Sequence, residues 1–243
     1  MPLPPTFEAR LVGKTKLTPS VQELTFERTD QKPFSFEPGQ WVSLILRQPE
    51  HEIRRAYSIA SAPSGGPTFQ LAVTHVEGGP GSTYLHEVGE GALLDVVGPQ
   101  GFFTRPLEKA GPALFVGTGT GVTPLRSMMR AAAAANHTAP MWLLFGHRTE
   151  ADLLYRDEFE ALARDTPNVR VELTLSRAGD TWTGRRGYVQ EHVRELWTAL
   201  EAMGHGPPHV YVCGLQRMVG AVRDLLRKEM SVPRQQVHSE RYD

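Results

Sequence analysis

The chain has 243 residues, enough for one large domain or two of ordinary size, and its 40% hydrophobic content is that of a globular protein. A formal net charge of −1 gives no overall field to attract nucleic acid or an anionic membrane. The single cysteine, Cys213, excludes an internal disulfide framework and a cluster held by four thiolates. Residues 1–6 lack a signal-peptide pattern, and no run reaches the roughly 18 apolar residues of a membrane helix, so we expect a soluble, cytoplasmic protein.

Residues 1–107 show the pattern of short β-strands separated by turns. Apolar and polar side chains alternate in several short runs, which is typical of strands with one buried face. Candidate strands are Leu24 with Phe26, residues 41–46, residues 69–73 and residues 93–97. Glycine- and proline-rich turns lie between them at 37–39, 63–66, 77–81 and 98–101. This spacing predicts a closed antiparallel β-barrel.

Residues 108–243 have a different rhythm, in which apolar strands alternate with helical stretches. The candidate strands are 113–117, 141–146, 169–175, 210–213 and 236–238, and the candidate helices are 124–135, 156–163, 189–202 and 216–230. The strands are almost continuously apolar, as strands buried on both faces are. The pattern predicts an α/β domain with a parallel sheet covered on both faces.

Unusual residues cluster after the carboxyl ends of these strands. They are Gly117-Thr118-Gly119-Thr120-Gly121, Gly146-His147-Arg148, Ser176-Arg177, Cys213-Gly214 and Glu240. In an open parallel sheet, ligands bind at this edge. The sequence therefore predicts a binding site there.

The glycine-rich segment 116–124 joins a strand to a helix. Glycines let the backbone approach a pyrophosphate, and free amides at a helix start bind anionic oxygens. Thr123 is expected to be the N-cap and Pro124 the first helical residue. The spacing differs from Gly-x-Gly-x-x-Gly, so a plain strand–helix turn remains an alternative.

The run Arg55-Ala56-Tyr57-Ser58 resembles the flavin motif Arg-x-Tyr-Ser of the ferredoxin–NADP reductase superfamily. Matching segments follow in the same order: Gly79-Pro80-Gly81-Ser82-Thr83-Tyr84-Leu85, Gly98-Pro99-Gln100-Gly101-Phe102, the glycine segment ending in Pro124, Cys213-Gly214 with Met218, and Glu240-Arg241-Tyr242. Together they span nearly the whole chain. The resemblance implies an FAD-binding, antiparallel Greek-key β-barrel at 1–107 and a parallel-sheet, nucleotide-binding domain for NAD(P) at 108–243. It also implies hydride transfer between NADP(H) and the flavin.

The resemblance implies specific roles in the barrel. Arg55 would bind a phosphate through two hydrogen bonds from its guanidinium group. Tyr57 would stack on the flavin ring, and Ser58 would place a hydroxyl near flavin N5. The segment Gly81-Ser82-Thr83 would open a helix, with Ser82 as its cap, and bind the flavin pyrophosphate. Further cofactor contacts are implied for Ala56, Leu71, Val73 and Thr74. Each position also has an ordinary structural interpretation, namely a surface arginine, a half-buried strand tyrosine or a simple helix cap.

One departure from the family concerns Thr74-His75, which stands where many relatives carry lysine or arginine. It leaves open how the adenine end of the flavin is held, and it keeps FMN as an alternative to FAD.

In the second half, the resemblance places Cys213 beside the nicotinamide, and Gly214 would let the nicotinamide ring come close. The alternative is that Cys213 is a small core residue, as a lone cysteine on a buried strand often is. Glu240 would relay a proton, and Tyr242 would cover the flavin face where the nicotinamide stacks. The expected catalytic residues are thus Ser58, Cys213, Glu240 and Tyr242. The extra Asp243 departs from the family ending, and chain ends are often disordered, so a frayed tail is the alternative.

Cofactor choice depends on cations near the adenosine 2′ position. Ser176-Arg177, followed by Arg185-Arg186 and Tyr188, resembles NADPH-using reductases. The remaining expected dinucleotide contacts are Gly117, Thr118, Gly119, Gly121, Thr123, Pro124, Arg148 and Gly214. Trp182-Thr183-Gly184 and the nearby Asp180 are also similar to NADH-using oxygenase reductases, so that alternative stays open.

The first interpretation of function is therefore a monomeric reductase that passes electrons between NADP(H), FAD and a ferredoxin or flavodoxin. The second is an NADH-dependent reductase component of an oxygenase, or a flavin reductase. The third is a non-catalytic flavin- or nucleotide-binding subunit. The cysteine count and the length exclude a fused iron–sulfur cluster or globin from this sequence.

Overall fold

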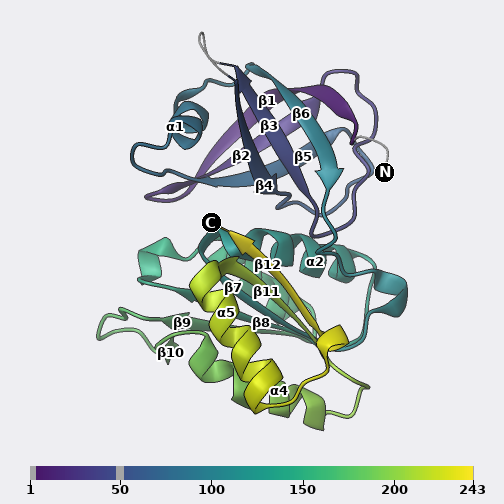
Figure 1. Ribbon diagram of the computed structural model, residues 1–243, viewed down its shortest axis with the longest axis vertical. Coiled ribbons are helices and arrows are strands. Elements are labelled where there is room, and N and C mark those ends of the chain that lie inside the picture. Colours follow the sequence, from purple (N-terminus) through teal and green to yellow (C-terminus); the bar gives the residue numbers. More distant parts are fainter. Residues whose placement is uncertain (1–3, 48–51, 243) are drawn as a thin grey trace. The chain divides into compact units, whose positions relative to one another are not determined.

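The computed structural model describes residues 4–47 and 52–242, which fold into two compact units (Figure 1). The first unit runs to Arg105 and also contains Arg126–Ala131. The second contains Pro106–Leu125 and the chain from Ala132 onward. Helix α2 (Val122–Ala134) is thus divided, because its first turn belongs to the second unit and its middle belongs to the first. No helix in the described ranges is long and apolar enough to cross a membrane.

The first unit is built on a six-stranded antiparallel sheet. Its strands are β1 (Thr6–Thr18), β2 (Val21–Arg28), β3 (Trp41–Arg47), β4 (Glu52–Ser58), β5 (Thr68–Thr74) and β6 (Leu93–Gln100). They lie in the order β4-β3-β6-β1-β2-β5. An antiparallel bridge between Ile59, just after β4, and Leu71 in β5 joins the two edge strands and closes the sheet into a barrel.

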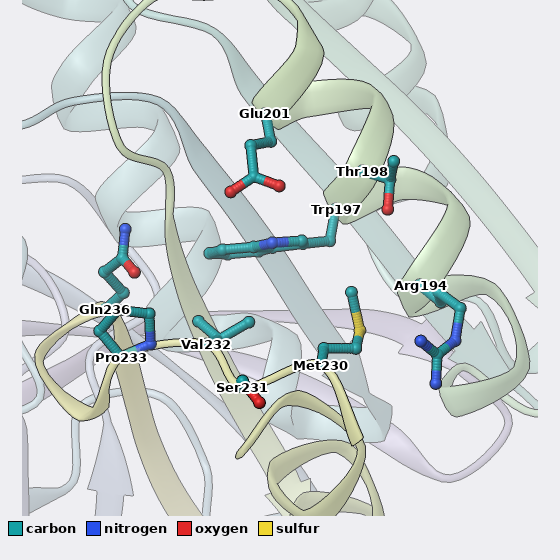
Figure 2. A pocket seen from close by; sticks show the side chains of 9 residues that line it. All are labelled: Arg194, Trp197, Thr198, Glu201, Met230, Ser231, Val232, Pro233 and Gln236. Carbon is teal, nitrogen blue, oxygen red and sulfur yellow. The ribbon is translucent and has the colours of Figure 1, made fainter. Parts of the chain in front are cut away.

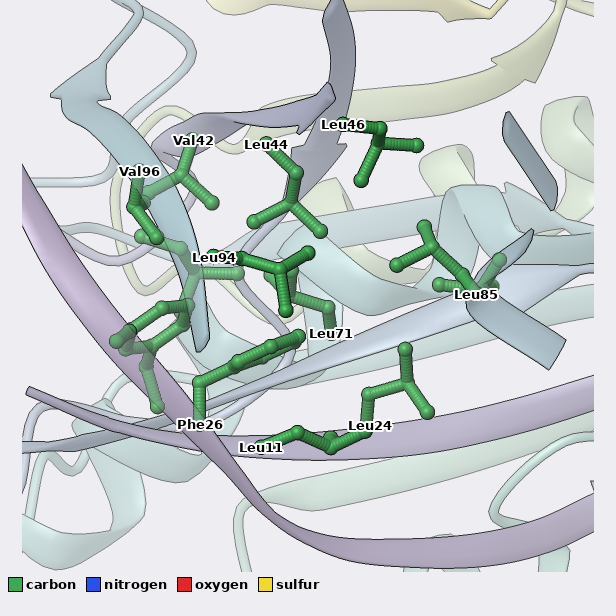
Figure 3. Close-up of a cluster of buried hydrophobic side chains, with 14 of the residues drawn as sticks. Leu11, Leu24, Phe26, Val42, Leu44, Leu46, Leu71, Leu85, Leu94 and Val96 are labelled. Carbon is green, nitrogen blue, oxygen red and sulfur yellow. The ribbon is translucent and has the colours of Figure 1, made fainter. Parts of the chain in front are cut away.

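The barrel interior is filled by the inward-facing residues of these strands (Figure 3). Phe26, Leu44 and Leu71 are fully buried there, and Leu85 adds the apolar face of helix α1 (Pro80–Glu87). Strand β1 was not predicted, although its alternating pattern of buried and exposed residues around Ala9 is as regular as that of β2. Each fully buried large side chain contributes about 1.5–3 kcal/mol, so this core fixes the strand ends that carry the flavin motif.

The second unit is a six-stranded parallel sheet with helices on it. Its strands are β7 (Ala113–Thr118), β8 (Met141–His147), β9 (Val169–Leu175), β10 (Arg185–Arg186), β11 (His209–Leu215) and β12 (Val237–Tyr242), in the order β10-β9-β8-β7-β11-β12. The remaining helices are α3 (Arg156–Asp165), α4 (Gln190–Ala202) and α5 (Gln216–Asp224), and α5 continues into a π-helical turn, Leu225–Glu229. Helices α4 and α5 pack on one face, against Val116, Leu144 and Val212. The strand order reverses between β7 and β11, which is the topological switch point of such a sheet.

The predicted fold class, an antiparallel barrel followed by a parallel α/β domain, is confirmed. The sequence pattern placed the last strand at 236–238, but β12 extends to Tyr242 because residues 239–242 also pair with β11. The alternative of a frayed tail is therefore wrong as far as Tyr242, and Asp243 lies outside the described residues. Arg185-Arg186 forms the short strand β10, paired with β9, rather than a loop.

Candidate functional site

The flavin motif occupies the end of strand β4 in the first unit. Ser58, the last residue of β4, is buried, while Arg55 and Ala56 are exposed. Tyr57 is half-buried and packs against the barrel core, and burial raises the pKa of its hydroxyl to about 12. The hydroxyl is therefore neutral at physiological pH and can act as a hydrogen-bond donor. The motif thus presents a cation, an aromatic ring and a hydroxyl along one short strand.

Helix α1 begins beside Arg55. A Cβ atom added to Gly81 would lie 2.9 Å from Cγ and 3.3 Å from Nε of Arg55, so the arginine stem crosses the first turn of α1. The first amides of a helix have no partner within the helix and carry partial positive charge. A larger residue at position 81 would fill this concavity. The guanidinium and the helix start together make a cradle that fits a pyrophosphate.

Ser82 does not cap this helix, contrary to expectation. The N-cap is Gly79, because Pro80 fits the first helical position and the helix starts three residues earlier than expected. The Ser82 hydroxyl accepts a hydrogen bond from the Val76 amide at 3.1 Å and lies 3.1 Å from the Gly79 carbonyl oxygen. It therefore fixes the loop that leads into the cradle, and Thr83 is one position further into the helix.

Strand β5 points the side chains of Leu71 and Val73 into the barrel core, where they cannot contact a cofactor directly. Both side chains are fully buried in the barrel core. The Val73 carbonyl accepts a hydrogen bond from the His86 ring, with 2.9 Å between O and Nε2. These two residues can reach a cofactor only through their backbone. Thr74, at the end of β5, is partly exposed.

The glycine segment of the second unit follows β7. Gly119 has a φ of +54°, and residues 119–121 form a 3-10 turn that runs directly into α2 at Val122. A Cβ on Gly121 would lie 2.3 Å from the Cys213 carbonyl oxygen, so this turn packs on β11 at the switch point. The expected cap is wrong, because Thr123 lies inside the helix and its hydroxyl donates to the Thr120 carbonyl at 2.8 Å. Pro124 is accordingly the third helical residue rather than the first.

A polar atom lies unpaired at the same switch point. Thr118 Oγ1 is buried and has no hydrogen-bond partner within the described residues. Gly214 has a φ of +149°, and a Cβ there would lie 2.5 Å from this oxygen. Buried polar groups are normally paired, so an unpaired hydroxyl between two glycine-lined strand ends fits a polar ligand such as a dinucleotide.

The three residues predicted to be catalytic in this unit lie together. Cys213 pairs in register with Gly117 of β7 and Glu240 of β12, which places their side-chain positions on one face of the sheet. Burial raises the pKa of the Cys213 thiol well above its ordinary value, and the Glu240 carboxylate adds to this. The Tyr242 hydroxyl hydrogen-bonds to Cys213 and lies 3.5 Å from Thr123 Oγ1. Cys213 is therefore a neutral, fully buried thiol and cannot serve as a nucleophile.

Two exposed arginines lie close together where β8 and β9 end. The Ser176 amide donates to the His147 carbonyl at 3.0 Å, and the Arg177 amide donates to the Arg148 carbonyl at 2.8 Å. Both arginine side chains are exposed, and no side-chain partner of Arg177 occurs in residues 4–47 or 52–242. Tyr188 is 61% exposed. These residues can meet a ligand phosphate and a nucleoside.

Arg185 and Arg186 already form hydrogen bonds with other groups of the protein. The Arg185 guanidinium donates to Glu195 at 2.7 Å and to Glu172 at 2.8 Å, and these hydrogen bonds raise its pKa despite partial burial. Arg186 donates to the Gly179 and Trp182 carbonyls at 2.9 and 3.1 Å. Both arginines hold the 179–186 segment in place. Arg185 is neutralised by carboxylates, whereas Arg186 is exposed and bonds backbone carbonyls.

The sequence reasoning missed Arg126 and Ser127 in α2, which are 3% and 0% exposed. Both bond the chain that follows Ser58 in the first unit. The signal was a charged residue in a predicted helix that also carries the apolar residues Leu125, Met128 and Met129. Such a residue at a buried position requires partners elsewhere in the chain.

A cavity of about 280 Å³ lies elsewhere in the second unit (Figure 2). Residues of α4, including Trp197 and Glu201, and the segment Met230–Gln236 line it. None of the predicted site residues is among them. Within the described ranges, no group of three His, Cys, Asp or Glu side chains is arranged to hold a metal ion.

Comparison with known proteins agrees with this geometry. Residues 8–104 match the oxidoreductase FAD-binding domain, and residues 115–224 match the oxidoreductase NAD-binding domain. The chain is 60% identical over 238 residues to ferredoxin–NADP reductase B of Sorangium cellulosum, covering 98% of each chain. It is 30% identical to the phenol hydroxylase P5 protein of Acinetobacter pittii, covering 97% of this chain and 65% of that protein.

Among solved structures, the Amycolatopsis cytochrome P450 reductase GcoB matches with a TM-score of 0.83 and 25% identity, over 98% of this chain and 69% of that one. The domain matches cover both units, and the Sorangium relative is similar along its full length. The chain therefore belongs to the ferredoxin–NADP reductase superfamily of FAD- and NAD-binding oxidoreductases.

Proposed function

We propose that the protein transfers hydride between NADP(H) and a bound FAD, and exchanges single electrons with a ferredoxin or flavodoxin. The observation that carries this proposal is the pairing of two sites in one chain. One is the cation-and-helix cradle beside Tyr57 and Ser58, and the other is the glycine-lined switch point beside Cys213. The 60% identity to a ferredoxin–NADP reductase supports the choice of electron carrier.

The residues of the first unit fit FAD. The flavin supplies a centre that accepts hydride and gives up electrons one at a time, and the protein supplies binding and orientation. Arg55 and the start of α1 hold the pyrophosphate, Tyr57 stacks on the ring, and Ser58 positions a hydroxyl at flavin N5. Ala56 and the backbone of β5 complete the contact.

The residues of the second unit fit NADPH. The amides of Gly117–Gly121 bind the pyrophosphate, and Arg177, aided by Arg148, meets the 2′-phosphate, with Tyr188 on the adenosine. Arg177 is the better candidate than Arg185 or Arg186, because both of these are engaged by protein groups. Its exposed guanidinium favours NADPH over NADH.

Cys213 and the tail form the proposed reaction centre of this unit. A neutral thiol beside the nicotinamide shapes its pocket without adding charge, and Gly214 lets the ring come close. Tyr242 contacts Cys213, so it regulates entry of the nicotinamide, while Glu240 moves a proton. We place the FAD-binding domain at 1–107 and the NAD(P)-binding domain at 108–243, and we propose a cytoplasmic monomer.

A second candidate function is the NADH-dependent reductase component of an oxygenase. It is favoured by the similarity to the phenol hydroxylase P5 protein, although this chain covers only 65% of that relative. The two candidates differ in the preferred dinucleotide and in the acceptor.

The decisive experiment is to purify the protein, identify its flavin by chromatography, and follow flavin reduction by NADPH and by NADH. Reduction of a ferredoxin and of a flavodoxin is then compared with reduction of free flavin. We expect stoichiometric FAD, faster reduction by NADPH, and transfer to a protein carrier. A protein that binds neither FAD nor FMN, or that neither dinucleotide reduces, overturns the proposal.

A further inference from the structure

We propose that Arg126 is a positioning residue for hydride transfer, because it fixes the backbone that carries Ser58. The inference rests on the proposed role of Ser58 at the flavin. It concerns the first unit, to which Arg126 and Ser127 belong. Arg126 itself is not placed at the cofactor, so its effect must pass through the segment Ser58–Ser61.

Arg126 is the centre of a buried polar network. Its Nη1 atom donates to the Ala60 carbonyl at 2.9 Å and to Oε1 of Gln70 at 3.2 Å, and it lies 3.5 Å from Oε2 of Glu23. Gln70 in turn donates through Nε2 to Oε1 of Glu23 at 3.0 Å. The side chains of Arg126 and Glu23 are 4% and 10% exposed. A single guanidinium thus satisfies a carboxylate, an amide and a backbone carbonyl.

The network acts on the residues that directly follow the flavin motif. The Ala60 amide donates to the Gln70 carbonyl at 2.8 Å, so both backbone polar groups of Ala60 are bound. The Ser127 hydroxyl donates to the Ser61 carbonyl at 2.7 Å, and the Ile59 amide donates to the Gln40 carbonyl at 2.9 Å. Every residue from Ile59 to Ser61 is therefore held through its backbone. Ser58 pairs with Trp41 of β3 and directly precedes this held segment, so Arg126 can act on the placement of Ser58 through the adjoining backbone.

A positioning role explains why a buried ion pair is used here. Buried charge pairs contribute little to stability compared with apolar residues of similar volume, so stability does not by itself account for them. The planar guanidinium of Arg126, however, directs one nitrogen, Nη1, toward a backbone carbonyl, an amide oxygen and a carboxylate, and an apolar side chain cannot do so. Reactive groups need placement within a fraction of an ångström, and small displacements slow the chemical step strongly.

The test separates positioning from stability with a double variant. Arg126→Met leaves Glu23 buried without its cation and should lower the Tm. Arg126→Met combined with Glu23→Leu removes both charges and should recover most of that loss. In the double variant, hydrogen exchange of the peptide covering 57–62 should still be faster than in the wild type. FAD should remain stoichiometric, and its reduction by NADPH in stopped flow should be roughly 10- to 100-fold slower.

Arg130→Met is the matched control, since it makes the same change one turn further along α2 at an exposed position. It should leave exchange at 57–62 and the reduction rate unchanged. If the double variant regains both the Tm and the wild-type exchange and reduction rates, Arg126 is only structural and the inference is wrong. If wild-type FAD is reduced by neither dinucleotide, the proposed function fails instead, while the exchange result still reports whether Arg126 holds the segment.

Discussion

The two units bind their proposed ligands by different means. In the barrel, the cradle depends on a side chain, Arg55, that projects from a hydrogen-bonded strand across the start of α1. In the parallel sheet, the switch point depends on missing side chains at Gly121 and Gly214, which let the glycine turn and the strand ends pack closely around one buried, unpaired hydroxyl. A charged fork on a rigid strand suits a cofactor that stays bound. A backbone-lined edge suits a dinucleotide that must enter and leave.

The largest effect on stability and binding is expected for Gly121→Ala, which alters the backbone-lined site in the parallel sheet. The new Cβ would meet the Cys213 carbonyl oxygen at 2.3 Å, and backbone cannot move aside as a flexible side chain can. We expect a loss of about 3 kcal/mol in the free energy of unfolding, the upper end of the usual range for overpacking. Dinucleotide binding should be lost while FAD stays bound. Thermal unfolding and equilibrium dialysis with NADP measure the two effects.

Gly220→Ala is the control for this substitution, because a Cβ there meets nothing within 4 Å. In helix α5 it should raise the free energy of unfolding by about 0.4–1 kcal/mol. Equal behaviour of the two variants would contradict the close packing of the glycine turn on β11.

Arg55→Ala alters the cradle in the barrel instead, because it removes the side chain on which that site depends. It removes charge-assisted bonds worth roughly 1.5–3 kcal/mol, which corresponds to about 10- to 150-fold weaker FAD binding. Fluorescence recovery of released FAD gives the dissociation constant. Arg54→Ala is the matched control, since Arg54 is the neighbouring exposed arginine and pairs with Glu52 at 2.9 Å. Equal losses of FAD in both variants would show a nonspecific charge effect.

Arg177→Ala tests the cofactor preference. The KM for NADPH should rise roughly tenfold, because one charge-assisted contact to the 2′-phosphate disappears, while the KM for NADH stays nearly constant. Steady-state kinetics with both dinucleotides measure this. In Arg185→Ala we expect a lower Tm with an unchanged ratio of the two KM values, since Arg185 bonds Glu172 and Glu195. A change in that ratio for Arg185→Ala would assign the specificity to the other arginine.

The smallest effect is expected for Ser58→Ala. Losing one hydroxyl hydrogen bond of about 1 kcal/mol should slow flavin reduction by roughly fivefold and leave FAD stoichiometric. Stopped-flow absorbance follows the reduction, and the spectrum of the purified protein gives the FAD content. Reduction at the wild-type rate would remove Ser58 from the proposed chemistry.

Much of the fold could be predicted from local pattern. Alternating residues such as those around Leu24 and Phe26 indicate a strand with one buried face, and the continuous run 113–117 indicates one buried on both. The glycine segment and Arg55–Ser58 are the segments from which both candidate sites were predicted, and the structure places each of them at the end of a strand. Element ends were less predictable. Ser82 and Thr123 are good capping residues, yet Pro80 and the 3-10 turn at 119–121 start their helices earlier.

The sequence by itself determined the two-domain architecture and indicated the stretches of chain proposed to carry the sites, because strand periodicity and glycine conformation are properties of neighbouring residues. Only the tertiary structure decided which arginines form hydrogen bonds with protein groups and which remain exposed. Arg185 and Arg177 look equivalent in sequence, but Arg185 is held by Glu195 and Arg177 is exposed. Arg126 likewise meets Glu23, more than 100 positions earlier in the sequence. A charge is available to a ligand only when folding brings no protein partner to it, and that depends on contacts between distant segments.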